Sequence, residues 1–321
     1  MKILVIKHGA LGDIINGTGA FSAIRQAFPK AMITFLTEPA YERLAWETGF
    51  FDDVWIDTRS KNPFKIWALC QKLKAQKFDW VFDLQNSKRT CWYFQFFGRR
   101  FPGSEPQPQW SGIALRCSHP QRRPDRRQLH AFLRFADQLK IAGLNLQDQE
   151  ALYPEMSWLK ADIRRFALPE KFIVLVPGSS KRGAYKRWPA EGYGKLAQWI
   201  RAHNVTPVLI GGPDEADVIA SIRFVAPQVF DLSGQTSFLE IGEIAKYALA
   251  TIGNDTGPVH LAAAVGCPTL ILWSKASSPE VFAPRGQHVK VLFKADIKTL
   301  SMEEILQALQ PFLEERTHHE R

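Results

Sequence analysis

The chain has 321 residues, of which 45% are hydrophobic, and its formal net charge is +9. This length suits two α/β domains of ordinary size, and the four cysteines lack the spacing of a metal site or a disulfide framework. The N-terminus does not resemble a secretory signal and the longest apolar stretch, 261–273, is too short to cross a bilayer, so we expect a cytoplasmic or peripheral protein.

Apolar runs typical of buried strands alternate with helical patterns along the chain. In the first half, strands are expected at residues 3–6, 32–36, 54–56 and 80–84, followed by a helix over about residues 127–141. In the second half they are expected at residues 172–176, 206–210, 229–231, 250–253, 269–272 and 289–293. The pattern predicts an α/β fold with two Rossmann-like, doubly wound domains facing a cleft, residues 1–150 and 151–321, connected through about 145–169.

A glycine turn follows the first expected strand. It reads Lys7-His8-Gly9-Ala10-Leu11-Gly12-Asp13 and precedes a helical pattern. It lacks the G-x-G-x-x-G order of a dinucleotide site, and no acidic residue ends the second strand, so such a site is disfavoured. The glycines let the backbone approach a ligand, and Asp13 is expected to face that ligand. The alternative is that Asp13 only caps the helix.

The positive charge is concentrated in the first half of the chain. Residues 1–150 carry a formal net charge of +8 and residues 151–321 one of +1. Arginines crowd the segment 98–127, which shows no clear strand or helix period up to Pro124. Because guanidinium groups bind phosphate and carboxylate, this segment is a candidate site for a polyanion or an acidic lipid surface. The alternative is a solvated run of charge.

Two glycine turns in the second half are candidate phosphate and ribose sites. Ser179, Ser180 and a following cation lie in the segment 176–189, at the carboxyl end of a strand, where open α/β sheets bind ligands. The segment does not match a Walker loop. Gly211-Gly212-Pro213 ends the next strand, and the carboxylates after it are candidates for binding a ribose hydroxyl.

A third turn, residues 253–264, leads from a strand end into a helix that begins near Pro258. The N–H groups of Thr256 and Gly257 are expected at the positive end of the helix dipole, which favours a phosphate. Asp255, Thr256 and His260 are candidates for contacts with the group that the phosphate carries. The alternative is that these residues only cap the helix and fill the core.

Together these motifs resemble the ADP-heptose lipopolysaccharide heptosyltransferases, inverting glycosyltransferases of the GT-B fold. The residues that carry the resemblance are Lys7-x-x-x-x-Gly12-Asp13, Asp83-x-Gln85, Lys186-x-Trp188-Pro189, Gly211-Gly212-Pro213 and Asp255-Thr256-Gly257-x-x-His260. The likeness covers almost the whole chain.

The resemblance implies a role for each matched residue. Asp13 corresponds to the catalytic base and Lys186 to the cation on the diphosphate of ADP-heptose. Ser179 and Ser180 correspond to a hydroxyl pair near the phosphates, and Glu215, or else Asp214, to the ribose ligand. Contacts with the nucleotide sugar fall on Asp255, Thr256, Gly257 and His260. The first domain is expected to bind the acceptor and the second the nucleotide sugar, without a metal or a cofactor.

The acceptor is expected to be a Kdo or a heptose in the anionic core of lipopolysaccharide. The protein is expected to be a monomer, and no binding of nucleic acid is expected. Peripheral contact with the inner membrane is a further expectation. Candidate acceptor contacts are Gly12, Arg59, Lys61, Gln85, Lys88, Arg122, Arg123, Arg126 and Arg127. Two other functions stay open: a sugar-nucleotide epimerase or another GT-B glycosyltransferase, and a non-catalytic module that binds polyanions.

Overall fold

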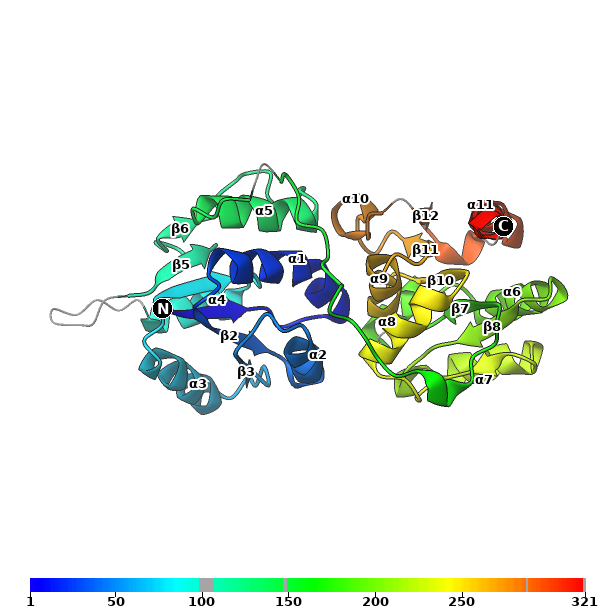
Figure 1. Ribbon diagram of the computed structural model, residues 1–321, viewed down its shortest axis with the longest axis horizontal. Helices are drawn as coiled ribbons and strands as arrows, with labels where there is room; N and C mark the ends of the chain where they lie inside the picture. The colour runs from blue at the N-terminus through cyan, green and yellow to red at the C-terminus, as the bar shows by residue number, and fades with distance from the viewer. Residues whose placement is uncertain (98–106, 147–148, 180, 287, 320–321) are drawn as a thin grey trace. The chain divides into compact units, whose positions relative to one another are not determined.

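The computed structural model describes residues 1–97, 107–146, 149–179, 181–286 and 288–319. It divides into two compact units, Met1–Trp158 and Leu159–Arg321, each built around a parallel sheet with helices packed on it (Figure 1). The division falls inside the segment expected to connect the domains. The prediction of two doubly wound α/β domains is confirmed.

The first unit contains one six-stranded parallel sheet in the order β3-β2-β1-β4-β5-β6. Its strands are β1 (Lys2–Ile6), β2 (Met32–Thr37), β3 (Asp53–Ile56), β4 (Trp80–Asp83), β5 (Gln109–Gly112) and β6 (His119–Pro120). Its α-helices are α1 (Leu11–Ala27), α2 (Glu42–Glu47), α3 (Pro63–Ala75), α4 (Lys88–Phe97) and α5 (Ala131–Ile141). The strand order reverses between β1 and β4, and such a switch point is where open α/β sheets bind ligands.

The arginine-rich segment differs from its prediction in two ways. Its described part contains strands β5 and β6, which escaped notice because four and two residues are too few to show a period. The following helix begins at Ala131 rather than near Arg127, because the side chain of His130 accepts a hydrogen bond from the N–H of Phe132 and so caps it. Arg122, Arg123, Arg126 and Arg127 therefore lie on the connection between β6 and α5, and Arg116 lies between β5 and β6.

The aromatic run of α4 supplies much of the core of this unit. Tyr93, Phe94 and Phe97 are buried and pack with Trp110 of β5. Trp92, by contrast, is 66% exposed and does not belong to this core. Figure 1 shows α1 and α5 on the side of the sheet opposite to α3.

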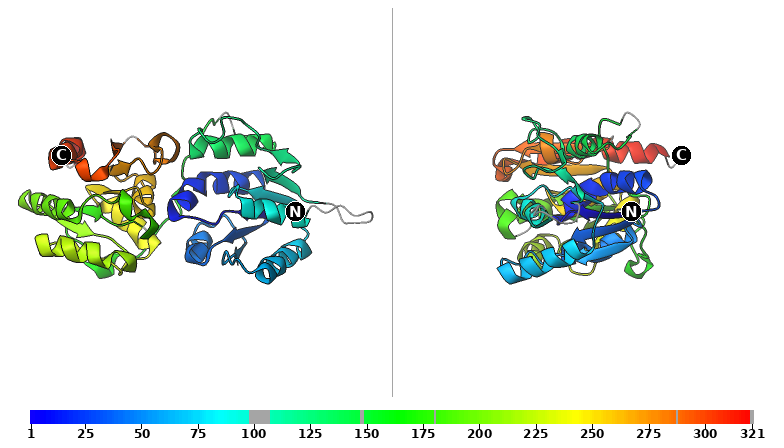
Figure 2. Two further views of the ribbon diagram at one scale, coloured as in Figure 1. Left: turned by 180° about the vertical axis from the view of Figure 1, so that it is seen from behind. Right: turned by 90° about the vertical axis from the view of Figure 1, so that its left-hand side faces the viewer.

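The second unit repeats the same topology, with strand order β12-β11-β10-β7-β8-β9. Its strands are β7 (Phe172–Val176), β8 (Thr206–Leu209), β9 (Phe230–Asp231), β10 (Ala250–Asn254), β11 (Thr269–Ser274) and β12 (Val289–Lys294). Its α-helices are α6 (Ala190–Ala202), α7 (Ala216–Val225), α8 (Phe238–Tyr247), α9 (Gly257–Ala264), α10 (Pro279–Phe282) and α11 (Met302–His319). Figure 2 shows the layers of each unit from two further sides. Here the strand order reverses between β7 and β10.

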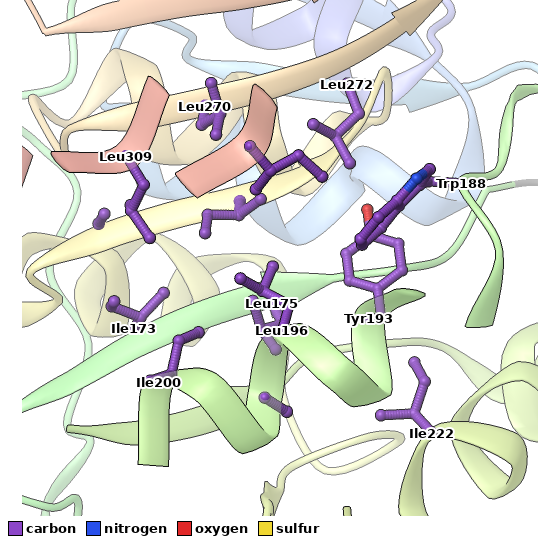
Figure 3. Packing of buried hydrophobic residues seen from close by; sticks show 14 of the residues in the cluster. Ile173, Leu175, Trp188, Tyr193, Leu196, Ile200, Ile222, Leu270, Leu272 and Leu309 are labelled. Atoms are coloured by element: carbon purple, nitrogen blue, oxygen red, sulfur yellow. The ribbon is translucent and has the colours of Figure 1, made fainter. Parts of the chain in front are cut away.

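The core of the second unit anchors the loop that follows β7. Trp188 is 4% exposed and lies edge-on to Tyr193, with the ring centroids 5.1 Å apart (Figure 3). The Trp188 indole N–H donates to the carbonyl of Leu300 at 2.9 Å. Because Trp188 is fixed in the core, the position of Lys186 two residues earlier is restricted as well. Among the described residues, no helix combines the length and hydropathy needed to cross a bilayer.

Candidate functional site

Asp13 lies in the first turn of α1, directly after the glycine turn that ends β1. Its Oδ2 atom accepts a hydrogen bond from the N–H of Ala10 at 3.1 Å, so the residue does stabilise the start of the helix. The side chain nevertheless remains 48% exposed. Capping and access to a ligand are therefore compatible at Asp13, and its role as the base stays a prediction.

Lys7 belongs to the motif that carries the resemblance but was given no role of its own, and it lies beside Asp13. Its Nζ atom is 3.9 Å from Oδ1 of Asp13, and its side chain is 7% exposed. Burial lowers the pKa of Lys7, while the nearby Asp13 carboxylate opposes that shift. The available signal was its place directly after the buried strand β1, where a lysine side chain is brought to the carboxyl end of the sheet.

A network of polar side chains holds the turn after β1. The N–H of His8 donates to Oε1 of Gln85 at 2.9 Å, which links the ends of β1 and β4 across the switch point. The imidazole Nε2 of His8 lies 3.1 Å from Oδ2 of Asp57. Burial disfavours ionisation of Asp57, but its contacts with His8, Arg89 and Tyr93 outweigh burial and lower its pKa. Gln85 thus holds the turn after β1 in place. Its contact with the acceptor stays a prediction.

Asp83, at the end of β4, is fully buried. Its Oδ1 atom accepts from the N–H of Asn86 at 2.9 Å, whereas Oδ2 has no hydrogen-bond partner among the described residues. Burial raises the pKa of Asp83 to about 6, even though hydrogen bonds from Thr90 and Asn86 favour its ionised form. A carboxyl group in such surroundings resists ionisation, which has a cost in stability at neutral pH.

The lysines and arginines predicted to contact the acceptor differ in whether they already form ion pairs or hydrogen bonds within the first unit. Arg59 pairs with Glu38 at 3.1 Å, and Arg123 pairs with Asp125 at 3.0 Å and with Asp137 at 3.3 Å. Arg126 donates to the amide oxygen of Gln121 at 2.7 Å and is partly buried. Four others are exposed: Lys61, Lys88, Arg122 and Arg127. Gly12 is buried in the first turn of α1.

Four residues of the second unit meet at the start of α9. Nζ of Lys186 donates to Oδ2 of Asp255 at 2.7 Å, and Nε2 of His260 lies 3.3 Å from the other carboxylate oxygen. The hydroxyl of Ser277, which the sequence reasoning missed, donates to the same Oδ2 at 3.1 Å. Nothing in the sequence pattern marked Ser277, because it lies in the loop after β11.

These contacts determine the charge of Asp255. Burial opposes its ionisation, but the hydrogen bonds from His260 and Lys186 outweigh burial and lower the pKa of Asp255 to about 2. The carboxylate is therefore ionised at neutral pH. A lysine ammonium has three N–H donors, and Asp255 uses one of them, so Lys186 retains donors for an anionic ligand.

Thr256 is the N-cap residue of α9, but its hydroxyl donates to the carbonyl of Asn254 at 3.3 Å rather than capping the helix. The N–H groups in the first turn of any α-helix have no partner within the helix. Gly257 is the first residue of α9 and Pro258, which has no N–H, is the second. The start of α9 thus has the chemistry of an anion site, and phosphate binding there stays a prediction.

Asn254 connects this turn to the loop after β7. Its side-chain oxygen accepts from the N–H of Trp188 at 3.0 Å, and its Nδ2 donates to the carbonyl of Pro177 at 2.7 Å. Asn254 is fully buried at the end of β10. It therefore fixes the separation of the two loops that present Lys186 and Asp255.

Ser179 is 3% exposed, and its hydroxyl already donates to the carbonyl of Gly183 at 2.8 Å. The Nε atom of Arg187 also donates to this hydroxyl, at 3.0 Å. In this arrangement Ser179 organises the loop, and its contact with a phosphate stays a prediction. Ser180, its expected partner, lies outside the described residues.

Glu215 lies at the end of a short turn after β8, and its Oε2 accepts from the N–H of Gly212 at 2.5 Å. The carboxylate packs so closely on Gly178 that a side chain at that position would collide with it. Burial raises the pKa of Glu215. The hydrogen bond from the N–H of Gly212 and the positive charge of Arg187 act in the opposite direction but do not outweigh burial. Glu215 is thus held at the carboxyl end of the sheet beside the loop after β7, and its contact with the ribose stays a prediction.

The predicted donor residues that the structure describes therefore gather at the switch point of the second sheet, and Asp13 lies at the switch point of the first. Among the described residues, no three His, Cys, Asp or Glu side chains are grouped so that they could hold a metal ion.

Comparison with known proteins agrees with this organisation. The family model described as glycosyltransferase family 9 (heptosyltransferase) matches residues 66–310. Lipopolysaccharide heptosyltransferase 3 of Escherichia coli is 29% identical over 276 residues, which are 82% of this chain and 80% of that protein. Lipooligosaccharide heptosyltransferase 2 of Haemophilus ducreyi is 23% identical over 316 residues, 91% of this chain and 88% of that protein.

Solved structures share the fold. E. coli ADP-heptose lps heptosyltransferase II matches with a TM-score of 0.79 at 20% identity, over 99% of this chain and all of that one. E. coli heptosyltransferase WaaC with ADP-2-deoxy-2-fluoro heptose matches with a TM-score of 0.74 at 17% identity, over 97% of this chain and 99% of that one. Both are similar to this chain in fold, with two Rossmann-like domains.

Proposed function

Because this chain belongs to glycosyltransferase family 9, the heptosyltransferases, we propose that it transfers a heptose from ADP-heptose to the inner core of lipopolysaccharide with inversion at the anomeric carbon. The acceptor is a Kdo or a heptose of the core. The chain is a glycosyltransferase with relatives named for lipopolysaccharide synthesis. The donor, the acceptor and the stereochemistry are the proposed part.

One observation supports this donor: Lys186 and His260 both contact the carboxylate of Asp255 at the start of α9. Nζ of Lys186 lies 2.7 Å from one carboxylate oxygen, and Nε2 of His260 lies 3.3 Å from the other. A diphosphate placed there meets the ammonium of Lys186 and the positive end of the helix dipole. The ionised Asp255 accepts hydrogen bonds, so it suits the sugar hydroxyls rather than the phosphates. Glu215, in the turn after β8, suits the ribose hydroxyls.

In the proposed reaction, the Asp13 carboxylate takes the proton of the acceptor hydroxyl as its oxygen attacks the anomeric carbon. The bond between that carbon and the ADP oxygen breaks on the opposite face, which inverts the configuration. Negative charge then grows on the leaving ADP, where the Lys186 ammonium and the first amides of α9 stabilise it. This route needs one carboxylate as base and no second carboxylate as nucleophile.

The test is to incubate the purified protein with ADP-heptose, with and without Kdo-lipid A or heptosylated core fragments. Release of ADP that requires an acceptor, together with a product one heptose heavier, supports the proposal. Consumption of ADP-heptose without an acceptor favours epimerase or hydrolase chemistry. Failure to bind ADP at all favours the polyanion-binding module.

A further inference from the structure

We propose that the outer face of α3 is a docking surface for an anionic phospholipid bilayer. The face centres on Phe64 and Trp67, which lie three residues apart and so share one side of the helix. Phe64 is 79% exposed and Trp67 is 54% exposed. Exposed apolar patches that polar residues border mark sites of interaction with proteins or membranes.

The buried side of α3 explains why these aromatics do not belong to the core. Cys70 and Leu73 are the buried residues of the helix, and Ile66 and Leu69 pack against the same core cluster. All four lie on the side of the helix that contacts the sheet. The helix therefore has a complete inner face without Phe64 or Trp67, and neither of these aromatics belongs to the core cluster of the unit.

The stretch of the chain that contains this face carries charges of one sign. Between Asp57 and Asp79 the chain has no acidic residue, whereas it has six basic ones: Arg59, Lys61, Lys65, Lys72, Lys74 and Lys77. By helical position Lys65 and Lys74 flank the aromatic pair on opposite sides, and both are exposed. Exposed aromatics bordered by lysines are typical of helices that lie in the interface of an anionic membrane.

A neighbouring helix extends the surface. α4 packs beside α3, and its exposed residues include Lys88 and Trp92, which lie four residues apart on one side of that helix. A tryptophan favours the headgroup region of a bilayer because its ring is apolar and its N–H is polar. The combination of exposed rings and positive charge favours a lipid surface over a second copy of this chain, which carries the same charge.

The surface is oriented suitably for the proposed reaction, and this step alone rests on the proposed function. α3 and α4 each start near the carboxyl ends of the parallel strands β3 and β4, the edge of the sheet that also holds Asp13. A lipid-anchored acceptor would then reach the sheet edge from the bilayer on which the unit rests. Vesicle binding itself requires no catalysis, so the two proposals fail separately.

The test is co-sedimentation of the full chain with vesicles of phosphatidylcholine containing about 30% phosphatidylglycerol, against phosphatidylcholine alone. We expect binding to the anionic vesicles that weakens as salt rises. Phe64→Ser/Trp67→Ser should lower the partition coefficient about ten-fold or more, and Lys65→Gln/Lys74→Gln about ten- to thirty-fold at low salt. Phe224→Ser, which removes a 90% exposed aromatic from the second unit, is the matched control and should bind normally.

Circular dichroism and ADP binding show whether each variant is folded, and the lysine variant changes only exposed positions. Equal vesicle binding by the wild type and both double variants would overturn the proposal. So would a wild type that ignores anionic vesicles. A wild-type dimer that Phe64→Ser/Trp67→Ser converts to a monomer, without vesicle binding, would assign the face to a second copy instead.

Discussion

Lys186 and Asp255, 69 residues apart in the chain, form an ion pair of 2.7 Å between Nζ and Oδ2. In the sequence Lys186 was matched to the diphosphate of the donor and Asp255 to contacts with the nucleotide sugar. Their pairing means that each residue orients the other before a donor arrives. It also means that a variant of either residue leaves the other one partly buried and without its partner.

Lys186→Met should weaken ADP binding by at least about ten-fold and lower turnover as well, because the ammonium contacts the diphosphate in both the ground state and the transition state. Isothermal titration with ADP measures the first effect and steady-state kinetics the second. Lys195→Met, at an exposed lysine of α6, is the matched control.

The loss of the ion pair must be separated from the loss of the phosphate contact. Lys186→Met/Asp255→Asn removes both charges and should recover part of the stability lost in Lys186→Met, as measured by urea unfolding. It should not recover ADP affinity. Tight ADP binding by either variant would place the diphosphate away from Lys186.

Much of this site was predictable because parallel strands bring their carboxyl ends to one edge of a sheet. The sequence placed Gly12-Asp13 and Asp83-x-Gln85 after two expected strands, and the structure shows that these strands, β1 and β4, are neighbours at the switch point. The roles of Ser277 and Asn254 could not be predicted, because they come from contacts with groups far away in the sequence, the Asp255 carboxylate for Ser277 and the backbone of Trp188 and Pro177 for Asn254. The strands β5 and β6 were missed for a different reason: at four and two residues they carry no period.

Asp13→Asn should lower turnover by about 10²–10⁴ while ADP affinity changes by no more than a few-fold, because an amide cannot take the proton of the acceptor. Asn keeps a side-chain oxygen to accept the Ala10 N–H, so the start of α1 should remain stable. Asp13→Ala should lose the same activity and about 1 kcal/mol of stability as well.

The matched control for Asp13 is Glu42→Ala, which removes an exposed acidic residue from the first turn of α2. It should leave turnover unchanged. Near-normal turnover of Asp13→Asn, with the acceptor present, would remove Asp13 from the role of base.

Asp83 should make the stability of the protein fall with rising pH between about pH 4 and pH 6. Its pKa is raised to about 6 in the folded state, so the folded protein binds more protons than the unfolded chain in that range. Stability is then greatest below the unfolded pKa and is lost as pH rises through the folded value. The total effect is about 3 kcal/mol.

Asp83→Asn lacks this titration and should gain stability relative to the wild type as pH rises from about 4 to about 7, with no further gain above that. Urea unfolding at a series of pH values measures the difference. Asp79→Asn, at an exposed carboxylate just before β4, is the control for general charge effects. A difference between Asp83→Asn and wild type that does not change with pH would mean that Asp83 titrates normally.

The arginines between β6 and α5 should contribute unequally to binding an anionic acceptor. Arg123 is held by Asp125 and Asp137, and Arg126 by Gln121, whereas Arg122 and Arg127 are exposed. Arg122→Gln/Arg127→Gln should therefore raise the acceptor KM and reduce its dependence on salt, with the donor KM unchanged. Adding Arg123→Gln and Arg126→Gln should raise the acceptor KM by less than the first two substitutions do. It should lower the stability by more, because these two arginines have partners within the unit. If the acceptor KM is unchanged even in the variant with all four arginines replaced, these arginines are only a solvated run of charge. The acceptor must then be sought near Arg59, Lys61 and Lys88.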